Sequence, residues 1–204
     1  MQGLVPTFGH RTSDFNQTPI YPESKGENHT FEVLDPGSSP SRIVSLTSAN
    51  VTSTPVQNVG VIATLTGRVG YLLFNDHIAT AEHALIDAIN QLNVAPGILD
   101  LVLDLRYNGG GFLGIASEIS YMIAGPVSTA GQPFETLQFN DKHPITNPVT
   151  GQPLSPTPFH ATAQGFSTPA GQALPTLNLP RVFVLVGSGT CSASESIINS
   201  LRWS

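Results

Sequence analysis

The chain of 204 residues has a single cysteine, Cys191, so internal disulfide bonds cannot hold its fold together. Charge is also scarce, because 11% of the residues are Asp, Glu, Lys or Arg, against about a quarter in an average soluble domain. Eight basic and fourteen acidic residues give a formal net charge of −6. This balance argues against nucleic acid or an anionic membrane surface as a partner.

Long hydrophobic runs and metal-binding patterns are missing as well. No apolar stretch approaches the ~18 residues of a membrane-spanning helix, and residues 1–7 have neither the basic patch nor the apolar core of a signal peptide. His77 and His83 lie six positions apart, which does not put them on one helical face as a metal-binding pair. We expect no membrane-spanning segment, no metal site and no cofactor.

Residues 182–201 are the most informative stretch that is present. Five consecutive apolar residues, 182–186, predict a strand covered on both faces. Apolar residues at helical spacing, from Ile197 to Leu201, predict a helix after it. Ser192 lies between the two, where unpaired helix N–H groups and the positive end of the helix dipole favour a developing negative charge. A serine in this place can act as a nucleophile.

Two other interpretations of this turn remain open. The segment from Ser192 to Glu195 also spells a capping box, in which the serine side chain and the glutamate side chain close the start of the helix. Cys191 could supply a thiol nucleophile, because the start of a helix also favours a thiolate. Packing as a small apolar residue is favoured over this role.

A second strand–loop–helix unit lies upstream, over residues 99–112. Its strand is followed by three consecutive glycines, Gly109 to Gly111, which reach positive φ without steric cost and can present N–H donors to an anionic oxygen. Asn108 suits the turn, and Asp104 with Arg106 should shape it by charge pairing or by bonds to the backbone. A plain flexible connection is the alternative. Phosphate binding is not favoured, because the pattern of a phosphate loop is absent.

Together the two units put a serine and a group of amide donors at the same end of neighbouring strands. Open α/β sheets form their ligand crevices at that end. A nucleophile beside an oxyanion hole indicates acyl transfer. No G-x-S-x-G pattern surrounds Ser192, which argues against an ordinary α/β-hydrolase.

The two motifs resemble those of the carboxyl-terminal processing (tail-specific) serine proteases. The glycine loop from Asp104 to Gly111 and the Ser-Ala-Ser-Glu segment after a Val-rich strand occur in the same order as in that family. The similarity extends from Val69 to Leu201. It implies a crotonase-like α/β core, hydrolysis of peptide bonds in a protein or peptide substrate, and an extracytoplasmic location, periplasmic or secreted.

The resemblance also implies a nucleophile, an oxyanion hole and two supporting residues. These are Ser192; the backbone amides of Gly110, Ala193 and Gly111; and Asn108 with Glu195.

The general base of that family has no counterpart in this sequence. In the family it is a lysine some two dozen residues beyond the serine, whereas Lys25 and Lys142 both precede Ser192 and the last residue is Ser204. Lys142 is expected to be a solvated surface charge. Because base assistance is worth about 10²–10⁴-fold in rate, we expect impaired activity from this chain. The alternative is a catalytically inactive module that binds a peptide or an apolar ligand on the same fold.

The predicted fold class is α/β, with mostly parallel strands and flanking helices. Residues 1–55 form an N-terminal loop and short strands, which by the resemblance end a PDZ-like module. Residues 56–204 form the protease-like catalytic domain, incomplete at its C-terminus.

Three parts of that domain can be outlined from periodicity. A strand over 69–74 leads to a helix over 79–94, and a further helix follows the glycine loop. The stretch 127–180 holds more than half of the seventeen prolines and predicts a long β excursion. Short hairpin strands in it, such as 134–139, are expected to border a substrate groove.

Overall fold

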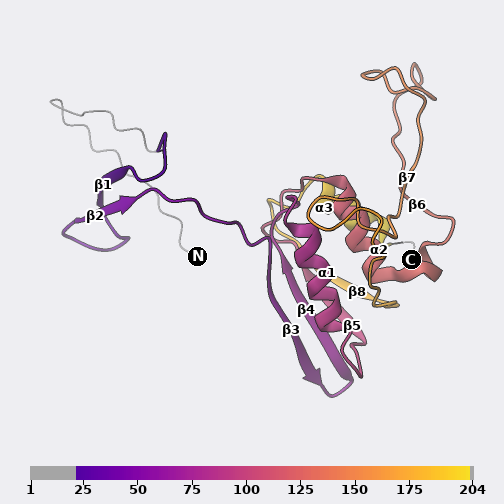
Figure 1. The fold of residues 1–204 in the computed structure, drawn as a ribbon, viewed down its shortest axis with the longest axis horizontal. Helices are drawn as coiled ribbons and strands as arrows, with labels where there is room; N and C mark the ends of the chain where they lie inside the picture. The colour runs from indigo at the N-terminus through magenta and orange to yellow at the C-terminus, as the bar shows by residue number, and fades with distance from the viewer. Residues whose placement is uncertain (1–21, 203–204) are drawn as a thin grey trace. The chain divides into compact units, whose positions relative to one another are not determined.

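The computed structural model describes residues 22–202, which fall into two compact units that divide between Thr52 and Ser53 (Figure 1). Much of the N-terminal loop expected within residues 1–55 therefore lies outside the described residues. The elements in chain order are β1 (Asn28–Val33), β2 (Arg42–Thr47), β3 (Val56–Thr64), β4 (Gly67–Phe74), α1 (Ala81–Leu92), β5 (Asp100–Asp104), α2 (Leu113–Thr129), β6 (Pro133–Glu135), β7 (Thr157–Pro158), β8 (Val182–Leu185) and α3 (Ala193–Ser200).

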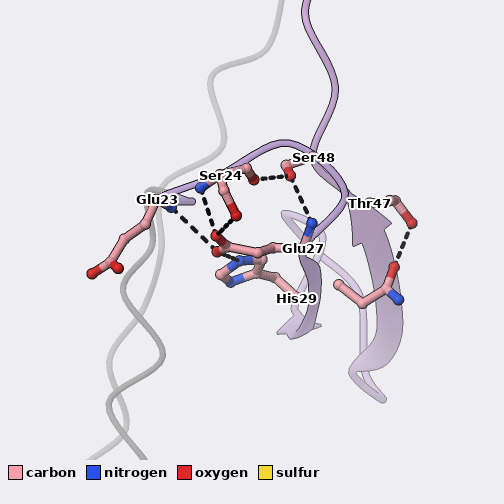
Figure 2. Close-up of polar contacts among 7 residues, drawn as sticks. Glu23, Ser24, Glu27, His29, Thr47 and Ser48 are labelled. Atoms are coloured by element: carbon pink, nitrogen blue, oxygen red, sulfur yellow. Dashed lines mark hydrogen bonds and ion pairs between the residues drawn. The ribbon is translucent and has the colours of Figure 1, made fainter.

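The first unit is a β-hairpin, in which two short strands of the kind expected within residues 1–55 pair with each other. β1 and β2 pair antiparallel from Asn28 opposite Thr47 to the turn-rich connection between them. Figure 2 shows how the open end is tied: the Glu27 carboxylate accepts the N–H and the hydroxyl of Ser24, at 2.5 and 2.6 Å, and faces the His29 ring at 3.2 Å. Polar contacts rather than a large apolar core close this end of the hairpin.

The second unit is built on a four-stranded sheet in the order β3-β4-β5-β8 (Figure 1). β3 and β4 are antiparallel, whereas β4, β5 and β8 run parallel to one another. The predicted mostly parallel sheet with flanking helices is confirmed. Because β5 and β8 are adjacent and parallel, with Asp104 opposite Leu185, the loops that follow them start side by side.

Two of the flanking helices follow from the apolar period of the sequence. α1 buries Leu85, Ile89 and Leu92 completely, and α2 buries a similar stripe that includes Ile119 and Met122. Burial of one such side chain contributes about 1.5–3 kcal/mol, so these stripes fix the helices on the sheet. α2 is kinked near its end, where a glycine with φ of 79° precedes a proline.

The prediction that residues 182–186 are covered on both faces is wrong. Along β8, Val182 and Val184 are half-buried, while Phe183 and Leu185 are 49% and 38% exposed. Phe183 and Leu185 share one face of the strand, because side chains alternate between the two faces, and no described element covers that face well enough to bury them. An unbroken apolar run does not by itself say how many layers cover a strand.

Two further features differ from the sequence-based expectation. β3 was not predicted, since five of its nine residues are exposed, the other four are only partly buried, and its apolar period is weak. The hairpin expected over 134–139 is shorter: β6 pairs with β7 only through Pro133 and Glu135. The long connection between them, residues 136–156, runs outward from this hairpin (Figure 1).

Candidate functional site

Ser192 lies at the turn from β8 into α3, in a backbone conformation that serine rarely adopts. Its φ is 56° and its ψ is −125°, whereas an ordinary helix N-cap is extended. Two asparagines, Asn58 and Asn178, are the other described non-glycine residues with positive φ, and asparagine tolerates this region far better. Strain of this kind costs about 1–3 kcal/mol and clusters at functional sites.

Ser192 and Glu195 also form the expected capping box. The Glu195 carboxylate accepts the Ser192 N–H at 3.2 Å, and the Glu195 N–H donates to the Ser192 carbonyl at 2.8 Å. Ser192 itself is exposed to solvent. The capping contacts explain how this helix begins, but they do not require the unusual dihedral angles of the serine.

The glycine loop packs directly on this turn. A Cβ atom added to Gly110 would lie 2.8 Å from the Cβ of Ser192 and 2.9 Å from the backbone nitrogen of Ala193, closer than real contacts allow. With φ of 99°, this position also needs a glycine. The structure therefore brings Ser192, Ala193 and the glycine loop together, as the pairing of their strands predicted.

Several hydrogen bonds join the two loops after β5 and β8. The Thr190 hydroxyl donates to the Leu105 carbonyl at 2.7 Å, and the buried Ser194 hydroxyl donates to the Asn108 carbonyl at 3.1 Å. The Cys191 thiol donates to a carbonyl of the glycine loop, that of Gly109, at 3.0 Å. Cys191 is thus a contact between the loops, although its side chain is exposed.

Asp104 and Arg106 shape the start of the glycine loop, as predicted. The buried Asp104 carboxylate accepts the Arg106 guanidinium at 2.6 Å and the Tyr71 hydroxyl at 2.7 Å. The guanidinium is the main cause that lowers the pKa of Asp104 to about 2, with help from Tyr71. The carboxylate is therefore ionised at neutral pH and acts as a structural anchor.

Asn108 is fully buried and holds the loop from inside. Its side-chain amide donates to the Phe74 carbonyl at 3.1 Å, and its side-chain oxygen accepts the Gly110 N–H at 3.0 Å. One of the predicted oxyanion donors, the Gly110 N–H, thus already has a partner inside the protein.

An open cavity of about 470 Å³ lies beside the serine. Gly111, Ser192, Ala193 and Glu195 are among its lining residues. It shares three lining residues, Glu135, Ser196 and Asn199, with a second cavity of about 410 Å³. The two cavities therefore adjoin along α3, and together they are called the groove here; Ser192 lines the first of them.

The far part of this groove is bordered by the hairpin of the long excursion. Phe134 and Phe159 line the second cavity and pack edge to face, with their ring centroids 5.6 Å apart. The Ser196 hydroxyl donates to the Glu135 carboxylate at 2.8 Å, which ties β6 to α3. The excursion thus borders the groove, although its strands are shorter than expected.

Sequence reasoning missed three buried polar residues near or behind the site, namely His77, Glu82 and Glu118. From the sequence, His77 was considered only as one half of a metal-binding pair, but its ring nitrogen Nδ1 lies 2.9 Å from the Asn108 side-chain oxygen. Its position just after the carboxyl end of β4 is the one signal that could have drawn attention to it.

A metal site, a membrane-spanning helix or a lysine near the serine would each bear on the kind of site. Within residues 22–202 there is no group of three or more His, Cys, Asp or Glu side chains that could hold a metal ion. None of the helices described is long and apolar enough to span a membrane. Lys142 is exposed and lies in the outward connection between β6 and β7.

Comparison with known families and structures gives a consistent result. The model of peptidase family S41 matches residues 68–203, more than half of the chain. Comparison with curated proteins gives no match.

Two similar solved structures are chains with protease descriptions. An S41 protease from Bacteroides fragilis NCTC 9343 is 25% identical over 87% of this chain and 46% of that one, with a TM-score of 0.58. The photosystem II D1 C-terminal processing protease is 21% identical over 87% of this chain and 41% of that one, with a TM-score of 0.52, which shows a shared fold. The present chain spans less than half the length of either.

Proposed function

This chain belongs to peptidase family S41, and we propose that its residues 56–204 form a serine endopeptidase domain in which Ser192 is the nucleophile. The substrate is a protein or peptide, which lies in the groove along α3. By the same family resemblance, the enzyme works outside the cytoplasm and residues 1–55 end a PDZ-like module.

The observation that carries the proposal is the contact between the strained Ser192 turn and Gly110. The serine is exposed and lines the groove, and an added Cβ at Gly110 would come within 3 Å of both Ser192 and Ala193. A strained serine at a strand-to-helix turn, beside backbone amides, is the arrangement that acyl transfer needs.

The proposed reaction passes through an acyl-enzyme. The Ser192 oxygen bonds to the carbonyl carbon of the peptide, and the π electrons of the carbonyl move onto its oxygen. The N–H groups of Ala193 and Gly111 stabilise that charge, because Gly111 lines the cavity and the Gly110 N–H is engaged by Asn108. The C–N bond then breaks, and water hydrolyses the ester to restore the hydroxyl.

The Ser192 proton must reach the leaving nitrogen, and the proposal assigns no general base within this chain. Residues 193–204 contain no lysine. With water alone as the proton carrier, the rate should be about 10²–10⁴-fold lower than with a positioned base. The chain of 204 residues is therefore proposed to be reactive at Ser192 but slow in turnover.

Covalent labelling by a fluorophosphonate during long incubation tests the proposal, because the strongly electrophilic phosphorus reports attack by the serine even when no general base speeds it. We expect one label per chain, on the peptide that contains Ser192, and no label on Ser192→Ala. Mass spectrometry of the digested protein identifies the modified residue.

Ser196→Ala is the matched control, because Ser196 lines the same groove one helical turn farther on. It should be labelled like the wild-type chain. Equal labelling of Ser192→Ala and the wild-type chain would contradict the proposed nucleophile.

A catalytically inactive peptide-binding module remains the second candidate. It is supported by the groove along α3, which needs no chemistry to hold a peptide. Binding of a peptide library to Ser192→Ala and wild-type chains with equal affinity, without labelling of either, would favour it.

A further inference from the structure

His77 stands next to the glycine loop through both its backbone and its side chain. It follows β4 by three residues and is 1% exposed, with its ring 4.4 Å from the ring of Phe74. Its carbonyl accepts the Phe112 N–H at 3.0 Å, and it forms a parallel bridge with Gly111. The end of the glycine loop is therefore fastened to His77.

The tautomer of this histidine follows from the bonds of Asn108. The Asn108 amide group donates to Phe74 and its oxygen accepts the Gly110 N–H, so both ends of the side chain are assigned. The oxygen can only accept, and the His77 nitrogen that faces it at 2.9 Å must therefore carry a hydrogen. Nδ1–H donates, and Nε2 is the unprotonated nitrogen.

The ring is also held neutral. Burial lowers the pKa of His77 to about 4, against the opposing effect of its bond with Asn108. Nε2 is buried and has no hydrogen-bond partner among the described residues. A buried polar atom without a partner is costly, and of the hydrogen bonds described for His77 only the Nδ1–H bond to Asn108 depends on the imidazole and offsets that cost.

We propose that His77 is a positioning residue for the oxyanion-binding loop. Its Nδ1–H fixes the Asn108 oxygen, that oxygen fixes the Gly110 N–H, and the peptide that follows then presents the Gly111 N–H beside Ser192. This role rests on the proposed function, because the loop acts on an oxyanion only if Ser192 is a nucleophile.

Two variants of opposite character test the role of the Nδ1–H donor. His77→Phe keeps an aromatic ring against Phe74 but removes the donor. His77→Asn loses the ring but can place an amide N–H close to the position of Nδ1. A purely structural role in packing would favour the phenylalanine variant, whereas positioning of Asn108 favours the asparagine variant.

The first readout is hydrogen exchange at the Gly110 amide, measured by NMR. We expect exchange about five- to tenfold faster in His77→Phe, as the loss of one hydrogen bond predicts, and close to the wild-type rate in His77→Asn. The second readout is the rate of fluorophosphonate labelling at Ser192, which should fall in His77→Phe and be largely restored in His77→Asn.

The wild-type chain provides an independent check that does not depend on how the variants fold. The 15N chemical shifts of the His77 ring at pH 7 should report a protonated Nδ1 and a bare Nε2. A protonated Nε2, or unchanged exchange at Gly110 in a folded His77→Phe, would overturn the inference.

The outcomes separate this inference from the proposed function. If the wild-type chain is not labelled while Gly110 exchange still responds to His77→Phe, the positioning stands and the protease proposal fails. If labelling proceeds at the wild-type rate in a folded His77→Phe, the nucleophile stands and the positioning role is wrong.

Discussion

At the scale of single residues, the site depends on the absence of a side chain at position 110. Gly110 has φ of 99°, and its Cα faces Ser192 and Ala193 so closely that a methyl group has no room. Three glycines follow one another in this loop, but they are not equivalent. Gly109 has an ordinary φ, and a Cβ there would meet its nearest neighbour at 3.8 Å.

We predict that Gly110→Ala lowers the rate of fluorophosphonate labelling at Ser192 by about 10²-fold, the usual cost of a damaged oxyanion hole. Its positive φ should also cost about 1–2 kcal/mol of folding free energy. Labelling kinetics and thermal unfolding measure the two effects separately.

Gly109→Ala is the control for Gly110→Ala, since it adds the same methyl group one residue earlier. It should label within about twofold of the wild-type rate, because its new contacts are ordinary van der Waals distances. If the two substitutions lowered the labelling rate equally, the site would not depend on the absence of a side chain at position 110.

At the scale of elements, two buried glutamates fasten the long excursion to the helices. The Glu82 carboxylate of α1 accepts backbone N–H groups from one short loop, residues 164–168, at 2.6–3.0 Å. Glu118 of α2 accepts the Gln164 N–H at 2.7 Å. The backbone N–H of Gln164 therefore donates to both carboxyl groups. One loop thus links α1, α2 and the excursion that borders the groove.

The two carboxyl groups are held in different protonation states. Burial alone would raise the pKa of Glu82, but the N–H groups of Ser167 and Thr168 outweigh it and keep the pKa below its usual value. Burial, with the neighbouring Glu82, raises the pKa of Glu118 to about 8. At neutral pH the pair is therefore a carboxylate beside a neutral carboxylic acid.

This arrangement predicts a loss of stability with rising pH. Between pH 4.5 and about 8, the folded chain keeps a proton on Glu118 that the unfolded chain has released. The Glu118 contribution to the free energy of unfolding is therefore greatest below pH 4.5. It falls by up to about 1.4 kcal/mol per pH unit until pH 8.

Glu118→Gln should remove this pH dependence, because the amide is a neutral substitute for the protonated acid. The free energy of unfolding of this variant should be close to that of the wild-type chain at pH 4.5 and greater than it at pH 8.5. Urea unfolding at a series of pH values measures the difference.

Glu82→Gln is the matched control on the other carboxyl group. It should destabilise the chain throughout the neutral range, since an amide NH₂ group would face the backbone donors of the loop. If the Glu118→Gln and wild-type curves run parallel from pH 4.5 to 8.5, Glu118 is not protonated in the folded chain.

At the scale of the whole molecule, the parallel pairing of β5 with β8 creates the site. The two strands are separated by the whole of α2 and the excursion, yet their carboxyl ends lie side by side. This is the place where open α/β sheets form crevices. The division of the chain between Thr52 and Ser53 leaves all the site residues in one unit.

We predict that limited proteolysis by elastase first cuts near Val51, which is 87% exposed in a segment without regular structure. The larger fragment should keep the thermal unfolding midpoint and the Ser192 labelling of the intact chain. Val149 is 88% exposed in the connection between β6 and β7, so the time at which elastase cuts there is compared with the time of the cut near Val51. Loss of cooperative unfolding after a cut at Val51 would show that the two units do not fold separately.

The sequence by itself determined the local elements and the two motifs of the site. Apolar periods set α1, α2 and the inner strands, and small residues marked the turns at Gly110 and Ser192, because these signals act between near neighbours in the chain. The capping contact of Glu195 was predictable for the same reason.

Only the tertiary structure decided which polar groups are buried together. His77 meets Asn108 across 31 positions, and Glu82 meets the 164–168 loop across more than 80, distances at which a sequence pattern carries no signal. Likewise, the exposure of Phe183 and Leu185 on one face of β8 depends on which elements pack on that face rather than on the two residues themselves. Burial and protonation are set by neighbours in space, and the fold alone selects those neighbours.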